Sequence, residues 1–270
     1  MGCIEISKTK NIMTYTKMSH GFFSDNVLNI AHRGASYDAP ENTMPAFHLA
    51  ANMGAYGIEC DAQLTKDGEV VIFHDVYLNR TSTGTGKIAD NTLAELRKLD
   101  AGSWKDSRFS HTSIPTLDEV FDEMPTHFLF NIELKSFAIF NQKLEAAVAR
   151  LIDHHRIQDR VIVSSFNLLS LLKMRRIDPS IKLGLLWSPY VPLFLYDYLI
   201  RYVISHEGFH PHWKSVTVEM VKQARRHGRY INVWTCDDSL AMQRLIKMGV
   251  ASIITNRPNL LREVLYSETK

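Results

Sequence analysis

Eight short runs of β-branched and other apolar residues alternate with helical patterns along this 270-residue chain, and this alternation constrains the fold most. Strands that are separated by helices pair in parallel within one sheet, and eight such repeats predict a single α/β domain, a (β/α)₈ TIM barrel. We place this barrel at residues 27–270, with a loosely ordered N-terminal arm at residues 1–26 and a small turn-rich insertion at residues 76–115. The predicted strands are Val27–Arg33, Tyr56–Gln63, Phe128–Lys135, Arg160–Ser165, Ile181–Trp187, Tyr202–Ser205, Ile231–Thr235 and Ala251–Asn256.

The second predicted strand is followed by a return strand, which adds an extra β-hairpin to the barrel. Asp67-Gly68 is a strong signal for a two-residue hairpin turn, because such a turn needs positive φ angles. With these residues at the centre of the turn, Asp61 lies opposite His74. Opposed residues, and residues two apart on one strand, point to the same face. Glu59, Asp61 and His74 are therefore predicted to share a face, and the alternative is an ordinary solvated polar face.

Seven motifs resemble those of the glycerophosphodiester phosphodiesterase family, whose members are phospholipase C-like TIM barrels. They are HRGASYDAPENTMPAF, GIECDAQLTKDGEVVIFHD, IPTLDEVF, NIELK, VSSF, INVWT and GVASIITNRP, and the resemblance covers residues 28–262. It implies a divalent metal on the carboxylates of the E-x-D and E-L-K strands, which are Glu59, Asp61 and Glu133 here. It also implies that the histidines of HRG and HD, His32 and His74, act as acid and base.

The chemistry of the three carboxylates fits the same roles. Without a cation, repulsion between Glu59, Asp61 and Glu133 would raise at least one of their pKa values. Ligation by oxygen atoms alone favours Mg²⁺ or Ca²⁺ over zinc, and we predict one divalent cation, Mg²⁺ or Ca²⁺, with Mn²⁺ as the alternative. The alternative for Glu133 is an ion pair inside the barrel with Lys135, two residues further along the strand.

A phosphodiester substrate brings a further negative charge, so cationic side chains are needed near the acids. Arg33 and Lys135 are the candidates, because a guanidinium can bind two phosphate oxygens and an ammonium acts as a point charge. Salt bridges to the same acids are the alternative role. Glu41 and Asn42 are predicted either to cap the first helix or to orient Arg33 or the substrate.

Aromatic residues follow several of the predicted strands. Trp234 is predicted either to pack against the glycerol carbons or to belong to the barrel core. The sequence His210-Pro211-His212-Trp213 is interpreted as a loop with a structural or substrate-shaping role rather than as a metal site. The apolar segment Trp187–Ile204 contains two prolines, an aspartate and an arginine, so we predict a barrel helix rather than a membrane span. Its alternative is an exposed patch that meets a lipid-like substrate or a partner subunit.

Composition narrows the class of partner and the compartment. A formal net charge of +2 gives no argument for nucleic acid as a partner. Three cysteines, Cys3, Cys60 and Cys236, imply no disulfide framework, and the N-terminus has no apolar core of a signal peptide. We therefore predict a cytoplasmic protein without a transmembrane segment. The family resemblance implies that its partner is a small-molecule glycerophosphodiester.

The predicted function is hydrolysis of glycerophosphodiesters to sn-glycerol 3-phosphate and an alcohol. A two-step route is the working hypothesis, in which the glycerol 2-hydroxyl attacks and water opens the resulting cyclic phosphate; direct attack by water is the alternative. Two other functions stay open on the sequence alone. One is phospholipase D-type activity on lysophospholipids, and the other is a non-catalytic barrel that binds phosphodiesters.

Overall fold

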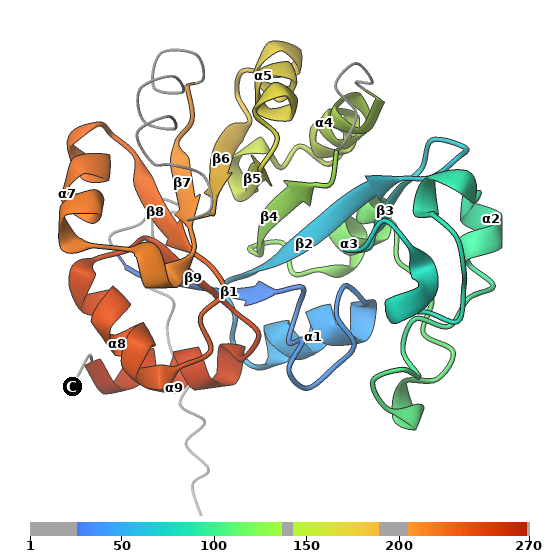
Figure 1. Ribbon diagram of the computed structural model, residues 1–270, viewed down its shortest axis with the longest axis horizontal. Coiled ribbons are helices and arrows are strands. Elements are labelled where there is room, and N and C mark those ends of the chain that lie inside the picture. Colours follow the sequence, from blue (N-terminus) through green and yellow to red (C-terminus); the bar gives the residue numbers. More distant parts are fainter. Residues whose placement is uncertain (1–25, 137–142, 189–204, 269–270) are drawn as a thin grey trace, which may run out of the picture.

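Eight parallel strands form the closed barrel that the sequence predicts. The computed structural model describes residues 26–136, 143–188 and 205–268 (Figure 1). Around the barrel the strands follow the order β1-β2-β4-β5-β6-β7-β8-β9, and β9 pairs with β1 to close it. The strands are β1 Leu28–His32, β2 Gly57–Leu64, β4 Leu129–Leu134, β5 Val161–Ser165, β6 Lys182–Trp187, β7 Gly208–Pro211, β8 Tyr230–Val233 and β9 Ser252–Thr255.

Helices surround the barrel and cover the outer faces of its strands (Figure 1). Apolar residues on the outer faces, such as Ile58 and Phe130, are fully buried beneath the helices. Gly57 allows β2 to approach β4, because a Cβ atom there would lie 2.2 Å from the carbonyl oxygen of Leu129. The helices are α1 Met44–Asn52, α2 Leu93–Leu96, α3 Leu117–Glu123, α4 Lys143–His155, α5 Leu168–Ile177, α7 Val218–Arg226, α8 Ser239–Met248 and α9 Pro258–Glu268.

The predicted hairpin exists, but its register differs from the prediction by one residue. Strand β3, Val70–Ile72, pairs so that Gln63 opposes Val71, and the N–H of Phe73 rather than of His74 bonds to the carbonyl of Asp61. The loop has three residues instead of two. Only Gly68 takes a positive φ, of 93°, whereas a two-residue type I′ turn needs positive φ at both central residues. Asp67 has no positive φ. Its carboxylate instead accepts hydrogen bonds from Thr65 Oγ1 and from the backbone N–H of Leu93.

The insertion between β3 and α3 packs as a small unit beside the hairpin, at the right of Figure 1. It contains three short 3₁₀ helices, at Leu78–Arg80, Ile88–Asp90 and Ser107–Phe109, in addition to α2. Leu78, Ile88 and Leu96 from this segment bury against Phe73 at the end of the hairpin. The insertion therefore supports the segment that carries His74.

Three predictions concern segments that the structure describes only in part. The sixth strand was predicted at Tyr202–Ser205, of which only Ser205 lies within the described residues; the structure shows a strand, β7, at Gly208–Pro211, so His210 and Pro211 belong to a strand and not to a loop. The apolar segment lies almost entirely in residues 189–204, outside the described residues, as does the N-terminal arm apart from Asn26. In the described part of the chain, we find no helix with the length and apolarity that a membrane crossing requires.

Candidate active site

Three carboxylates, two buried and one partly buried, meet inside the barrel at the carboxyl ends of β2 and β4. Glu59 and Asp61 lie two residues apart on β2 and so point to the same face, and Asp61 pairs in register with Glu133 on β4. One oxygen from each carboxylate lies within 4.8 Å of the others. Glu59 is 4% exposed and Asp61 is fully buried. The predicted metal ligands are thus brought together by strand register.

The three carboxylates differ strongly in their affinity for protons. Burial raises the pKa of Glu59 well above its usual range, and Asp61 and Glu133 raise it further. Burial also raises the pKa of Glu133 to about 7, although Lys135 opposes the shift. Burial acts in the same direction on Asp61, but Lys135 and Arg33 outweigh it and hold the pKa of that carboxyl well below its usual range. The positive charges of Lys135 and Arg33 therefore relieve only part of the repulsion among the three acids.

The donor set fits a divalent cation. All the ligand atoms are carboxylate oxygens, which suit Mg²⁺ and Ca²⁺. Asp61 Oδ1 is buried without a hydrogen bond, although Lys135 Nζ lies 3.0 Å away as an ion-pair partner. Lys135 Nζ also bonds Glu133 Oε1 at 2.6 Å, so the predicted ion pair within β4 is present and coexists with the acid cluster. A cation at this cluster would occupy free acceptor positions and remove the remaining repulsion.

The loop after β1 holds a second ring of contacts around Asp61. Arg33 and Asn42 both adopt left-handed backbone conformations, with φ of 55° and 57°, which cost on the order of 1 kcal/mol each for residues other than glycine. Arg33 Nε lies 3.2 Å from Asp61 Oδ2, and its Nη1 donates to Glu41 Oε1 at 2.8 Å. Asn42 Nδ2 donates to Asp61 Oδ2 at 2.7 Å.

These contacts distinguish between the roles predicted for Glu41 and Asn42. The first helix has Thr43 at its N-cap, and no side chain caps it, so helix capping by Glu41 or Asn42 is wrong. Glu41 instead orients Arg33, and Asn42 orients Asp61. Both residues hold charged side chains at the site.

The two predicted catalytic histidines both lie within the influence of the Asp61 charge, and each is fixed through its Nδ1 atom. His32 Nε2 lies 3.9 Å from Glu59 Oε2, and its Nδ1 is 2.7 Å from Asn256 Oδ1. His74 Nδ1 is 2.6 Å from Asp75 Oδ1. Burial lowers the pKa of His32 to about 4, assisted by the charge of Arg33, and burial also lowers the pKa of His74. Both rings are therefore neutral near pH 7, and each is engaged through Nδ1 rather than through Nε2.

Aromatic residues form the opposite side of the barrel mouth. Trp234, after β8, contacts Phe166 and His212 edge to face at centroid distances of 5.6 Å each. Its indole N–H donates to the carbonyl of His210 at 2.7 Å, which fixes the ring plane. His210 itself is fully buried in the barrel interior, where its ring lies against Gly184 and bonds Asn232. The structural role predicted for His210 agrees with this position.

Three residues at the site were not predicted to take part in it. Asp75 holds His74 and accepts a hydrogen bond from Arg80 Nε at 2.6 Å. Arg80 also donates to Glu41 at 2.7 Å, so the insertion and the first loop are linked through one guanidinium. Asn256 contacts His32 across 224 residues of sequence. The dipeptide His74-Asp75 carried a usable signal for Asp75, whereas nothing local marks Arg80 or Asn256.

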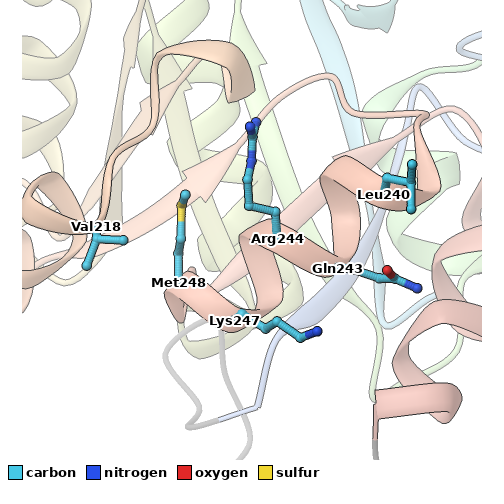
Figure 2. Close-up of a pocket in the computed structure, with 6 residues that line it drawn as sticks. All are labelled: Val218, Leu240, Gln243, Arg244, Lys247 and Met248. Carbon is cyan, nitrogen blue, oxygen red and sulfur yellow. The ribbon is translucent and has the colours of Figure 1, made fainter.

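A separate surface pocket lies between α7 and α8 and is distinct from the barrel mouth (Figure 2). It is lined by Val218 of α7 and by five residues of α8, which are Leu240, Gln243, Arg244, Lys247 and Met248. None of the residues of the acid cluster contributes to it.

Comparison with known proteins identifies relatives over most of the chain. The sequence model of the glycerophosphoryl diester phosphodiesterase family matches residues 32–260. A glycerophosphodiester phosphodiesterase from Caldanaerobacter subterraneus subsp. tengcongensis is 40% identical over 235 residues, which are 87% of this chain and 96% of the relative. One from Bacillus subtilis is 34% identical and covers 89% of this chain and 87% of its own. The structure of an Oleispira antarctica phosphodiesterase, in complex with the product sn-glycerol-3-phosphate, superposes with a TM-score of 0.81 at 33% identity, covering 88% of this chain and 96% of that one.

Proposed function

Because the chain belongs to the glycerophosphoryl diester phosphodiesterase family, we propose that it hydrolyses glycerophosphodiesters to sn-glycerol 3-phosphate and an alcohol. The observation that carries the proposal is the meeting of Glu59, Asp61 and Glu133 with His32 and His74 at one barrel mouth. Two buried acids and one partly buried acid beside two histidines suit a charged substrate that needs proton transfer at two oxygen atoms.

In this proposal Glu59, Asp61 and Glu133 hold one divalent cation, Mg²⁺ or Ca²⁺, with Mn²⁺ as the alternative. When bound, the cation supplies Lewis-acid polarisation of a phosphoryl oxygen and offsets negative charge. Arg33 and Lys135 add two fixed positive charges on the same side of the site. They attract the phosphodiester and favour the extra negative charge of its transition state.

The two histidines exchange protons with the reacting oxygens. One neutral imidazole accepts the proton of the attacking hydroxyl at Nε2, and the other histidine, after it has taken up a proton, donates that proton to the leaving alkoxide. The attacking group in our working route is the glycerol 2-hydroxyl, which gives a cyclic phosphate that water then opens with the two roles reversed. Trp234 would pack its exposed ring edge against the glycerol carbons, since its N–H is already engaged with His210.

The proposal is tested by assaying glycerophosphocholine, glycerophosphoethanolamine, glycerophosphoglycerol and lysophosphatidylcholine with Mg²⁺, Ca²⁺, Mn²⁺ or a chelator. We expect turnover of the glycerophosphodiesters, loss of activity in chelator, and release of sn-glycerol 3-phosphate. His32→Gln and His74→Gln should each lower kcat by ~10²–10⁴-fold. The matched control is His48→Gln, because His48 is a half-exposed histidine of α1 that pairs with Glu123 on the outer surface.

Two results would contradict the proposal. Faster turnover of the lysophospholipid than of every glycerophosphodiester would favour the phospholipase D-type function. A non-catalytic barrel would be favoured if the wild type bound the substrate without turnover and both histidine variants bound it with the same affinity. Equal turnover of a substrate that lacks the 2-hydroxyl would exclude the cyclic-phosphate route alone.

The cytoplasmic location remains part of the proposal. It is supported by Cys60 and Cys236, which are buried free thiols, as expected for a protein kept in a reducing compartment.

A further inference from the structure

Two hydrogen bonds link His32 through Asn256 to Asp237, a residue that lies outside the acid cluster. Asp237, between β8 and α8, accepts a hydrogen bond from Asn256 Nδ2 at Oδ2, over 2.6 Å. Asn256, which follows β9, then places its Oδ1 atom 2.7 Å from His32 Nδ1. Ser36 Oγ also donates to Asn256 Oδ1 at 2.7 Å. Asp237, Asn256 and His32 come from the ends of three strands that are adjacent in the barrel.

The direction of each hydrogen bond follows from Asp237. A carboxylate only accepts, and Asp237 Oδ1 is already occupied by Thr255 Oγ1 and by the backbone N–H of Asn256. The Asn256 amide must therefore turn its NH₂ group toward Asp237 Oδ2 and its oxygen toward His32. An oxygen acceptor at that distance requires a proton on His32 Nδ1.

From this geometry we propose that Asn256, held by Asp237, is a positioning residue that fixes His32 in the Nδ1–H tautomer. A neutral imidazole carries one ring proton, so Nε2 is left with a free lone pair beside Glu59, 3.9 Å from its Oε2. His32 is then prepared to accept a proton at the acid cluster. This inference rests on the proposed function, because the catalytic value of the tautomer depends on His32 acting as a base.

His74 is held in a different way, which sets the two histidines apart. Its Nδ1 bonds directly to the Asp75 carboxylate at 2.6 Å, with no amide between them. The His32 side of the site instead separates the ring from the acid by one neutral amide. A substitution at Asp237 can therefore reverse the orientation of the Asn256 amide.

Asp237→Asn is the test of this arrangement. The introduced amide oxygen still accepts from Thr255 and from the Asn256 N–H, so its NH₂ group faces the NH₂ group of Asn256. The Asn256 amide then flips and presents donors to His32 Nδ1, which moves the ring proton to Nε2. We expect kcat to fall by about 10²-fold, the low end of a general base's contribution, while KM changes less than about threefold.

The double variant D237N/N256D should rescue activity. In it a carboxylate at position 256 accepts both from His32 Nδ1 and from the introduced amide at position 237, which restores the original tautomer. The matched control is Asp238→Asn, which makes the same charge change one residue away. Asp238 caps α8 through Ala241 N–H, a role that asparagine also fills, so activity should stay unchanged.

The tautomer is read directly from two-bond ¹H–¹⁵N correlation spectra of ¹⁵N-histidine-labelled protein, with the His32 signals assigned by their loss in His32→Gln. Wild type, the double variant and D238N should show Nδ1–H at His32, and D237N should show Nε2–H. An Nδ1–H signal in D237N, or lost activity that the double variant does not recover, would overturn the inference. Because the spectra need no turnover, they separate its failure from a failure of the proposed phosphodiesterase function, which would show as an inactive wild type.

Discussion

Binding of a divalent cation should release protons from the acid cluster, and the affinity should therefore decrease below neutral pH. Burial raises the pKa of Glu133 to about 7 and raises that of Glu59 well above its usual range. Carboxylates bind metal ions in their ionised form, so a bound proton must leave first. A raised carboxyl pKa means that protons are held up to that higher pH. The affinity must then rise with pH across the window in which Glu133 ionises.

The size of the effect follows from the pKa of Glu133. A carboxyl with a pKa of about 7 is about 90% protonated at pH 6 and about 10% protonated at pH 8. The apparent association constant should therefore increase about tenfold from pH 6 to pH 8 through Glu133 alone. The proton on Glu59 makes the dependence steeper. The same ionisation destabilises the metal-free fold as pH rises toward 7, because the folded chain then binds more protons than the unfolded chain.

Isothermal titration calorimetry with Mg²⁺ measures both quantities. Titrations at pH 6, 7 and 8, each in two buffers of different ionisation enthalpy, give the affinity and the number of protons released. Glu133→Gln should bind Mg²⁺ more weakly but with a smaller pH dependence, since one titrating group is gone. Glu123→Gln, a half-exposed acid at the end of α3, is the control and should match wild type. An affinity that is constant from pH 6 to pH 8, with no proton release, would refute the reasoning.

Three substitutions test other contacts of the fold and site. Asp75→Asn removes the carboxylate that holds His74, so kcat should fall ~10-fold or more, while urea unfolding changes by less than ~1 kcal/mol because the pair is partly exposed. Gly57→Ala places a Cβ atom 2.2 Å from the Leu129 carbonyl, and the free energy of unfolding should fall by about 2–3 kcal/mol or more in the same urea assay. Gln63→Leu removes two hydrogen bonds to the segment around His74, and should cost about 1–3 kcal/mol together with a measurable loss of kcat.

The barrel could be predicted because its strands are local features. Runs such as Ile181–Trp187 combine β-branched or apolar residues with helical patterns on either side, and the structure places strands there. The sixth barrel strand, β7, was not predicted at Gly208–Pro211 because this run has a weak preference for strands, whereas the preceding Tyr202-Val203-Ile204, which lies outside the described residues, has a strong one. Pairing of Gly208 with Gly184 on β6 decides the position, and the two glycines leave the space that the ring of His210 fills. Tertiary packing overrides local preference at this strand.

The acid cluster could be predicted for a related reason. Glu59 and Asp61 share a face through the period of two along one strand, and Glu133 follows from the resemblance of the E-L-K motif. Contacts that do not follow from the two-residue repeat along a strand could not be predicted in this way. Asn256 and Asp237 reach His32 from the other end of the sequence, and an amide that orients a ring has no composition or spacing that marks it.

In the hairpin, His74 lies close to Asp61 although the predicted register is wrong by one residue. If Asp61 paired with His74 as predicted, the turn would set the position of His74. The pairing of β2 with β3 instead ends at Ala62 and Ile72, before His74. The side-chain amide of Gln63 instead donates to the carbonyls of Phe73 and Asp75, on both sides of His74, at 2.7 Å and 2.8 Å. Because these bonds form beyond the last strand pair, a change of one residue in the loop does not by itself reverse the direction of His74. Buried Gln63 of β2 therefore helps to hold His74. Because β2 also carries Glu59 and Asp61, one rigid strand positions two of the three acids and supports the histidine.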